Sequence, residues 1–377
     1  MMSQIQIDGS LGEGGGQVLR IALTLSALYK IPVKIDNIRA GRPKPGLAAQ
    51  HLKGVELLQS MCNAEVQGAH IGSTCLEFKP NQLNMDRRRT FMVDIGTAGC
   101  IGLLVQVAVP CALFFPPGQN VKLILKGGTN VPMGPHIDYL TNVFTPLLHN
   151  FGVDINCVCV KRGYYPKGGG EVHVYVPSGR VLNAVTLMNP GVPTMIHGDS
   201  HVAGVVPIKE AYKMAQDAKE VLLKGLRQYN INDQQLDIRV SKKDTTTAYG
   251  NGSAINLQCL TTTNYCFGGS GLGSGRQQQI APGVQAANEI LNAILSGSCV
   301  DEHAQDQLII FMALASGTSK INLGRQKLTS HTETAMKVVE IMLKNYNFHF
   351  QLSEKEVGDN ISYILECKGC GYKSVTA

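Results

Sequence analysis

The first 180 residues contain the same series of predicted elements twice, and this repeat limits the possible folds more than any other feature of the sequence. Residues 4–8 alternate polar and apolar side chains as a strand does, and a glycine-rich turn then leads into an apolar helix over residues 17–29. Residues 91–95 and 100–109 repeat this strand, glycine turn and helix about 90 residues later. In both units a strand, a second helix and further strands follow. The pattern predicts an α/β domain built from repeated units.

The rest of the chain divides into an inserted segment and a less distinct third unit. That unit would consist of helices and strands at residues 284–295, 307–315, 319–323, 331–344, 347–352 and 361–367. Residues 185–282 differ in composition and contain a polar helix at residues 208–229 and a threonine-rich strand region. We therefore predict a large repeated-unit domain from residues 1–184 and 283–377, with residues 185–282 as a smaller inserted α/β domain.

The composition fits an ordered globular protein with reduced thiols. A chain of 377 residues is long for one hydrophobic core, which favours two or three domains. The 11 cysteines are odd in number, and no apolar signal stretch follows the first methionine, so we expect a reducing compartment. The pairs Cys157/Cys159 and Cys367/Cys370 have the spacing of metal ligands. No second motif completes the four ligands of a zinc site, so structural or incidental cysteines are favoured.

One apolar segment, residues 98–117, is about as long as a bilayer span. It contains Gln106 and Pro110 and ends in two prolines. We expect its helix to end near Val109, which leaves it too short to cross a membrane. The segment therefore predicts a buried core helix and no membrane association.

The glycine turn before the first helix is a candidate anion site. Residues 14–16 are all glycine, and the first N–H groups of a helix point toward any group at its N-terminus. Arg20 follows Gln17 by one helical turn on the same face, and Glu13 could hold a divalent cation against phosphate oxygens. A tight turn with Glu13 as a helix cap explains the same residues equally well.

Two basic segments are candidates for contacts with phosphate. Arg39, Arg42 and Lys44 surround a proline-containing turn, and arginine forks match phosphate oxygens. A solvated loop is an equally good interpretation. The run Arg87–Arg89 more simply lies on the surface, where it would add a nonspecific attraction to nucleic acid. The net charge of +6 is mild but compatible with a polyanionic substrate.

The remaining glycine turns lack the features of common nucleotide-binding loops. KGGTN at residues 126–130 and KGGGE at residues 167–171 are not followed by the Gly-Lys-Ser/Thr of a P-loop. In the segment DEHAQDQ at residues 301–307, Asp306 and Gln307 could bind a purine or a ribose hydroxyl. Taken alone, this segment is better explained as an acidic cluster at a helix N-terminus.

His331 differs from the other nine histidines in its setting. It follows Thr329 and Ser330 and opens a predicted helix. A helix N-terminus lowers the pKa of an imidazole and attracts phosphate, so a neutral His331 could attack phosphorus as a nucleophile. A capping role for this serine- and threonine-rich turn is the more common explanation.

Six segments occur in a characteristic order: GSLGEGGGQVLR (9–20), IRAGRPKPGLAAQH (38–51), KGGTNVPMGPHIDY (126–139), RGYYPKGGGEV (162–172), HAQDQLIIFMALAS (303–316) and LTSHTETA (328–335). Together they resemble the RNA 3′-terminal phosphate cyclase family in its animal type. The glycine triplet resembles the family signature RG-x-x-P-x-GGG. The resemblance covers residues 1–180 and 285–345, and it implies three repeated βαβαββ units, as in the enolpyruvyl transferases, plus an inserted small domain.

The resemblance implies a ligase that uses ATP to convert an RNA 3′-terminal phosphate into a 2′,3′-cyclic phosphodiester. His331 would attack the α-phosphorus of ATP, and the resulting histidine-bound AMP would pass to the RNA 3′-phosphate. The adjacent 2′-hydroxyl would then displace AMP. Adenylylation supplies a leaving group that a phosphate monoester lacks, and the 2′-hydroxyl is already in place for the last step. Arginines and a metal would screen the phosphate charge.

The resemblance also assigns roles to individual residues. Glu13 would bind a divalent metal, magnesium or manganese. The phosphates and the RNA end would be bound by Arg20, Arg39, Arg42 and Gln50. ATP would be bound by Gln106, Pro135, Asp306 and Gln307. Vertebrate members carry tyrosine where this chain has His303, and since an imidazole can also stack on adenine, His303 is retained as an ATP contact.

Proteins with two other functions are similar to parts of this family pattern. A noncatalytic relative, the cyclase-like ribosome-biogenesis factor, has the fold and the glycine signature but lacks the histidine nucleophile. The presence of His331, Asp306 and Gln307 favours the enzyme. Enolpyruvyl transfer shares only the architecture and would require a small carboxylated substrate. The resemblance further implies a nucleoplasmic location, with a cytoplasmic pool as an alternative, and is compatible with a homodimer.

Overall fold

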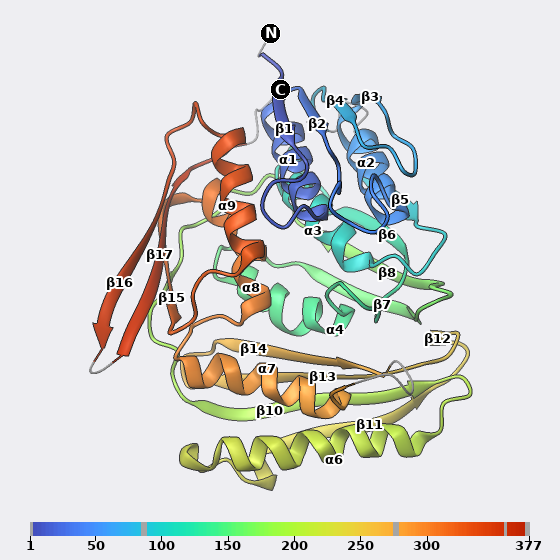
Figure 1. The fold of residues 1–377 in the computed structure, drawn as a ribbon, viewed down its shortest axis with the longest axis vertical. Helices are drawn as coiled ribbons and strands as arrows, with labels where there is room; N and C mark the ends of the chain where they lie inside the picture. The colour runs from blue at the N-terminus through green and yellow to red at the C-terminus, as the bar shows by residue number, and fades with distance from the viewer. Residues whose placement is uncertain (1–2, 84–88, 274–278, 358–359, 374–377) are drawn as a thin grey trace.

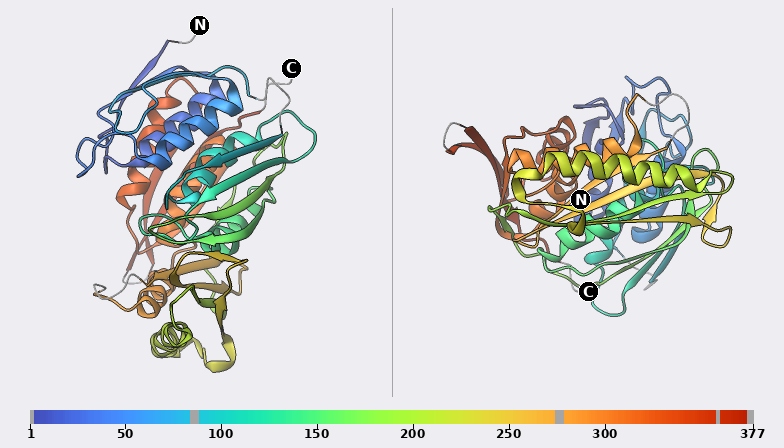
Figure 2. Two further views of the ribbon diagram at one scale, coloured as in Figure 1. Left: turned by 90° about the vertical axis from the view of Figure 1, so that its right-hand side faces the viewer. Right: turned by 90° about the horizontal axis from the view of Figure 1, so that it is seen from below.

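The computed structural model describes residues 3–83, 89–273, 279–357 and 360–373. As predicted, the protein has a mixed α/β fold (Figure 1). Three β-sheets lie on the outside of a group of packed helices, and a fourth sheet forms a separate layer with two helices at the lower end of the view. Figure 2 shows the same two-part arrangement from the side.

The first part contains β1 (Ile5–Asp8), α1 (Gly16–Tyr29), β2 (Val33–Asp36), α2 (Ala49–Cys62), β3 (Glu65–Gln67) and β4 (Leu76–Lys79). Its strands form a sheet in the order β1-β2-β4-β3. β1 and β2 are parallel, whereas β4 runs antiparallel to both of its neighbours. These elements agree with those expected for the first unit.

The second part contains β5 (Thr90–Asp94), α3 (Ile101–Leu113), β6 (Val121–Gly127), α4 (Ile137–Tyr139), a π-helical turn (Leu140–Phe144), α5 (Thr145–His149), β7 (Asn156–Gly163) and β8 (Gly170–Val176). Its sheet has the order β7-β8-β6-β5, and a short strand, β12 (Ala248–Tyr249), joins the outer edge of β7. β5 and β6 are parallel, and β8 runs antiparallel to both of its neighbours.

The third part contains β9 (Thr186–Leu187), α8 (Glu302–Leu314), β15 (Ser316–Gly324), α9 (Ser330–Met342), β16 (His349–Val357) and β17 (Asn360–Cys370). Its sheet has the order β16-β17-β15-β9. β9 and β15 are parallel, and β17 runs antiparallel to both of its neighbours. Among the described strands, the three sheets therefore share one strand order and one pattern of directions.

The fourth sheet belongs to the segment between β9 and α8. This segment contains β10 (Pro193–Ala203), α6 (Ile208–Gly225), β11 (Leu236–Lys243), β13 (Gly252–Thr261), β14 (Cys266–Leu272) and α7 (Pro282–Ser296). The strand order is β11-β10-β13-β14, and α6 and α7 pack on this sheet around a hydrophobic cluster of their own (Figure 1).

The packing differs from the predicted domain boundaries, residues 185 and 282, at both ends of this segment. Residues 284–295, expected to open the third unit, form most of α7, which packs on β14 and α6 through residues such as Ala286 and Ile290. β9 lies inside the expected insert but pairs with β15 of the larger part. An apolar helix face shows that a helix is buried, not which sheet buries it. The boundaries of independent folding units stay a prediction.

Helix α3 confirms the expected buried helix but is longer than predicted. It continues through Pro110 to Leu113, although proline removes a backbone donor and disfavours a helix interior. Every residue from Val107 to Leu113 is buried, so packing on neighbouring helices outweighs the loss of one hydrogen bond. No helix in the described ranges is long and apolar enough to cross a membrane.

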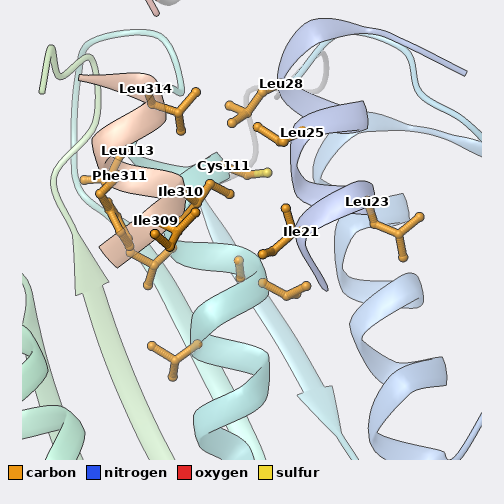
Figure 3. Close-up of a cluster of buried hydrophobic side chains, with 14 of the residues drawn as sticks. Ile21, Leu23, Leu25, Leu28, Cys111, Leu113, Ile309, Ile310, Phe311 and Leu314 are labelled. Carbon is orange, nitrogen blue, oxygen red and sulfur yellow. The ribbon is translucent and has the colours of Figure 1, made fainter. Parts of the chain in front are cut away.

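Helix α1 is the centre of the main hydrophobic core. All of its residues from Ile21 to Tyr29 are buried. Figure 3 shows Ile21, Leu25 and Leu28 facing side chains of α3 and α8, such as Cys111 and Ile310. Each fully buried large apolar side chain contributes about 1.5–3 kcal/mol, so this packing fixes α1 against its neighbours α2, α3 and α9. The N-terminal turns of α1 and α8 carry the polar residues described below.

The predicted surface run Arg87–Arg89 is described only in part. Arg89 donates hydrogen bonds to the carbonyl oxygens of Pro116 (2.9 Å) and Gln119 (3.3 Å) and to Oγ of Ser178 (3.0 Å). Arg89 therefore ties two loops together instead of projecting into solvent. Arg87 and Arg88 lie outside the described residues.

Candidate active site

His331 lies in the first turn of α9, where that helix packs against α1 (Figure 1). Its Nδ1 is 3.1 Å from a carboxylate oxygen of Glu13, and the side chain is 53% exposed. The helix cap is supplied by Thr329, whose Oγ1 accepts the N–H of Thr332 at 3.1 Å. The turn thus has the expected capping residue, and the imidazole of His331 is left to contact Glu13.

Glu13 links His331 to the basic loop of the first part. One carboxylate oxygen contacts His331, and the other is 3.3 Å from Nη2 of Arg42. Arg42 also donates to the backbone oxygen of Glu13 at 3.1 Å. Burial alone would raise the pKa of Glu13, but His331 and the nearby arginines outweigh burial and lower it. The hydrogen bond to Glu13 in turn raises the pKa of His331, so the lowering expected from the helix N-terminus is wrong.

The glycine turn before α1 allows this close approach. A Cβ atom on Gly15 would lie 2.4 Å from Oε1 of Glu13, and one on Gly16 would lie 2.4 Å from Nε2 of His51. Helix α1 has no side-chain cap at its N-terminus and no acidic residue in its first turn. Its first N–H groups therefore remain available to an anion.

His51 is a residue of this site that the sequence interpretation missed. Its Nδ1 accepts the backbone N–H of Ala48 at 3.1 Å, so in the neutral ring Nε2 carries the proton and faces Gly16. Burial, together with the charges of Arg20 and Arg39, lowers the pKa of His51 to about 3. The only signal in the sequence is that His51 directly follows Gln50 in the same segment.

Arg20 connects the glycine turn with α8. Its Nη2 donates to Oε1 of Gln17 at 2.5 Å, and Nε2 of Gln17 donates to Asp306 at 2.9 Å. Burial lowers the pKa of Arg20 and raises the pKa of Asp306. The negative charge of Asp306 opposes the first shift, and the positive charge of Arg20 opposes the second. Gln17, which lies in the predicted glycine motif but received no role there, is the direct link between the two helices.

A small pocket extends from this link into the protein interior. It is lined by Gln17, Arg20, Ile21, Gln106, Phe144, Asp306, Gln307, Ile310 and Phe311. Nε2 of Gln307 donates to the backbone oxygen of His303 at 2.7 Å, whereas its Oε1 is buried and accepts no hydrogen bond within the described structure. A buried acceptor without a donor is costly, so Gln307 fits a ligand that brings an N–H or O–H group.

The segment at residues 301–307 supplies both a helix cap and a contact to α1. Asp301 caps α8 by accepting the N–H groups of His303 and Ala304, as an acidic helix cap does. Asp306, one turn further, faces Gln17 instead. Nε2 of His303 is 3.5 Å from Glu289, and this carboxylate and that of Asp301 outweigh burial and raise the pKa of His303 to about 9.

The other predicted residues lie at the rim of this region. Arg39 donates to the backbone oxygen of Gly46 at 2.7 Å and thereby holds its own turn. Oε1 of Gln50 accepts the N–H of Cys100 at 3.0 Å, just before α3 begins. Pro135 lies at the same end of α3, where its carbonyl oxygen accepts from Sγ of Cys100 at 3.4 Å.

The contacts therefore join His331, Glu13 and Arg42 in one group, and Arg20, Gln17 and Asp306 in another that shares the first turn of α1 with it. The glycine triplet at residues 168–170 is not part of either group; it leads into β8 and lies against Thr97 and Tyr249. An exposed imidazole, three guanidinium groups and uncapped helix N–H groups suit a phosphorylated ligand.

Comparison with known proteins gives the same family over nearly the whole chain. A model of the family "RNA 3′-terminal phosphate cyclase" matches residues 11–348. A Pyrobaculum neutrophilum protein named RNA 3′-terminal phosphate cyclase is 39% identical over 98% of this chain and 99% of its own. A Drosophila melanogaster protein of the same name is 36% identical over 98% of this chain and 97% of its own. The chain belongs to the RNA 3′-terminal phosphate cyclase family, a ligase-type family of enzymes.

Proposed function

We propose that this protein uses ATP to convert the 3′-terminal phosphate of an RNA into a 2′,3′-cyclic phosphodiester. The observation that carries the proposal is the Glu13–His331 pair at the uncapped N-terminus of α1. Glu13 holds Nδ1 of the imidazole, while Nε2 makes no hydrogen bond within the described structure. A histidine oriented in this way is suited to nucleophilic attack.

The geometry supports His331 as the group that carries AMP. When Glu13 accepts the Nδ1 proton, the lone pair of the neutral ring lies on Nε2, which faces away from Glu13. Nε2 would form a bond to the α-phosphorus of ATP as the bond to pyrophosphate breaks. The AMP group would then pass to an oxygen of the RNA 3′-phosphate, which restores the free imidazole. Attack by the neighbouring 2′-hydroxyl would release AMP, and the hydroxyl proton would go to solvent.

The arginines fit the charge that develops in these steps. Arg42 is placed by Glu13, and Arg20 by Gln17, beside the first turn of α1. Neutral His51 adds an N–H donor at Gly16. Donors that are already oriented stabilise phosphoryl charge without reorganisation during the reaction.

The pocket beside α8 supports adenine binding. The unpaired Oε1 of Gln307 would accept from the adenine amino group, and Gln106 lines the same pocket. Gln307 bonds to the backbone carbonyl of His303. The imidazole ring of His303 is half-exposed and meets the ring of Tyr139 edge-on. We infer that a cationic imidazolium at this position stacks on the base where vertebrate members use a tyrosine.

A divalent metal fits Glu13 only as a single protein ligand. In the described ranges, no group of three or more His, Cys, Asp or Glu side chains is arranged so that it could hold a metal ion. Magnesium is often held by one or two carboxylates, with phosphate oxygens and water completing its shell. Glu13 would supply that carboxylate once ATP is present, and the metal would neutralise phosphate charge.

The direct test is incubation of the protein with ATP and an RNA that ends in a 3′-phosphate. The expected product resists phosphatase and yields a 2′,3′-cyclic end on analysis, with one AMP and one pyrophosphate released per RNA. Without RNA, α-labelled ATP is expected to leave an acid-labile label on the denatured protein. An unmodified RNA and an unlabelled protein would contradict the proposal and favour the noncatalytic function.

Replacing Glu13 with glutamine is expected to slow protein adenylylation by about 10- to 100-fold. The amide cannot accept the Nδ1 proton of His331 with the strength of a carboxylate, and it is a poorer metal ligand. The measurement is the rate of label incorporation at several manganese concentrations. Glu65→Gln, at an exposed ion pair with Lys79, is the control. An unchanged rate at every metal concentration would contradict both roles of Glu13.

The noncatalytic function is not favoured, because a scaffold has no need of an oriented and exposed His331. A nucleoplasmic location and a homodimer stay predictions. Fractionation of cells and light scattering of the purified protein would test them separately.

A further inference from the structure

The family signature at residues 162–170 builds an exposed surface outside the candidate active site. Figure 1 shows β12 beside β7, at the opposite side of the molecule from β15, β16 and β17. We name four residues of these two chain segments the Tyr165 patch: Lys161, Tyr165, Lys167 and Tyr249. Tyr165 is 68% exposed and Tyr249 is 47% exposed.

The contacts within the Tyr165 patch are specific. Nζ of Lys161 lies 5.8 Å from the centre of the Tyr249 ring. A Cβ atom on Gly169 would lie 2.2 Å from the same ring, so the glycine signature is what lets Tyr249 lie against the turn. The side chain of Lys167 extends over Gly250, next to Tyr249.

The Tyr165 patch rests on a rigid base. Backbone pairing joins β12 to β7, and the N–H of Arg162 donates to the carbonyl oxygen of Thr247 at 2.8 Å. Arg162 is itself held by two short hydrogen bonds to Asp138, of 2.6 and 2.7 Å. Tyr164 is buried under Gly252, which turns the neighbouring Tyr165 outward. Backbone that is already ordered beneath the patch loses little conformational freedom on binding.

The Tyr165 patch is continuous with the candidate active site. A Cβ atom on Gly168 would lie 2.4 Å from the carbonyl oxygen of Thr97, so the signature turn lies directly on the turn before α3. That turn ends at Cys100, whose N–H is bound by Gln50, the neighbour of His51. Thr97 is exposed, and Gly99, which lies beside Gln50, is half-buried, so partly exposed backbone of this turn lies between Gln50 and the patch.

The charge at the Tyr165 patch is positive but moderate. Lys161 and Lys167 make no ion pair among the described residues. Asp244, in the turn just before β12, accepts hydrogen bonds from Thr246 and Thr247. Glu171, opposite Lys161 in the sheet, is paired with Lys126 and His173. Exposed aromatic rings between unpaired lysines are typical of surfaces that bind single-stranded nucleic acid.

We propose that the Tyr165 patch binds the single-stranded RNA segment that precedes the 3′-terminal phosphate. Tyr165 stacks on a base, and Lys161 and Lys167 contact the phosphates on either side of it. The RNA then follows the surface over Thr97 to the site at Gln50 and His331. The identity of the substrate rests on the proposed function, whereas the binding of single-stranded RNA can be measured independently.

The test compares two double variants that change the same residue types. Tyr165→Ala/Lys167→Glu alters the patch. Tyr212→Ala/Lys213→Glu alters an equally exposed pair on α6, where Tyr212 is 62% exposed. Binding of a fluorescent 12-nucleotide single-stranded RNA is measured by anisotropy. The patch variant is expected to bind about tenfold more weakly, with a shallower salt dependence, and the α6 variant as the unmodified protein does.

Cyclisation gives a second readout. For the unmodified protein, kcat/KM is expected to be higher for a 12-nucleotide RNA 3′-phosphate than for a dinucleotide, and this ratio is expected to fall about tenfold in the patch variant. An unchanged RNA affinity, or an equal loss in the α6 variant, would overturn the proposal. So would a changed oligomeric state in light scattering with unchanged RNA affinity. If the unmodified protein binds RNA through the patch but cyclises neither RNA, the proposed function fails while this inference stands.

Discussion

Replacing His331 with alanine is expected to lower the transfer of AMP from ATP to the protein by about 10⁴-fold or more. Alanine has no nitrogen that can form the bond to phosphorus. The measurement is incorporation of α-labelled ATP into the denatured protein, followed by mapping of the labelled peptide. In the unmodified protein the label is expected in the peptide that contains His331, and cyclisation of RNA is expected to fail together with labelling in the variant.

A second histidine in the site, His51, could carry the label instead of His331. His51 is the other neutral imidazole at the first turn of α1, and its Nε2 lies beside Gly16. A label that maps to His51, or that persists in His331→Ala, would overturn the role of His331. His149→Ala, at an exposed histidine of α5, is the control and is expected to label normally.

A loss of folding would not explain the result. The side chain of His331 is half-exposed, and the cap of α9 is made by Thr329. Substitutions at such positions usually change the free energy of unfolding by no more than about 0.5 kcal/mol. Urea unfolding of His331→Ala should therefore match that of the unmodified protein.

The largest effect on stability is expected from Arg162→Ala, which should lower the free energy of unfolding by about 3–5 kcal/mol. Arg162 makes two hydrogen bonds to Asp138 and one, of 3.0 Å, to Asn130. Asp138 also accepts from Asn256 of the fourth sheet at 3.1 Å. Without Arg162, a carboxylate that is only 12% exposed would lose its closest counter-charge. Urea unfolding checks the value, and Lys79→Ala, at an exposed ion pair, is expected to cost at most about 1 kcal/mol.

The effect of Arg162→Ala should also depend on pH. Burial alone would raise the pKa of Asp138, but Arg162 outweighs burial and lowers it well below its usual range. A carboxyl group with a lowered pKa stabilises the folded state above its unfolded pKa of about 3.9, and this contribution is lost as the pH falls. The difference between the variant and the unmodified protein should therefore narrow below about pH 4. A constant difference from pH 7 to pH 3 would contradict the role of the Asp138 charge.

Much of the fold was predictable because its signals are local. The alternation at residues 4–8, the glycine turn and the apolar helix that follows each depend on neighbours within a few residues. The helix end at Val109 was wrong because proline is a local signal, whereas the burial of α3 between other helices is not. Residues 284–295 were correctly expected to form a helix, but the sheet on which α7 packs could not be predicted from its own apolar face.

By itself, the sequence determined the mixed α/β class, the family resemblance and the candidate residues in each motif. Only the tertiary structure decided which of these residues meet. Glu13 contacts α9 across 321 positions of the chain, and Gln17 contacts Asp306 across 289. The tertiary structure also places Gln17 and His51 in the site and the glycine triplet at residues 168–170 outside it. The reason is physical: periodicity and turn chemistry act over a few residues, whereas the position of a side chain in a site depends on how separate helices pack.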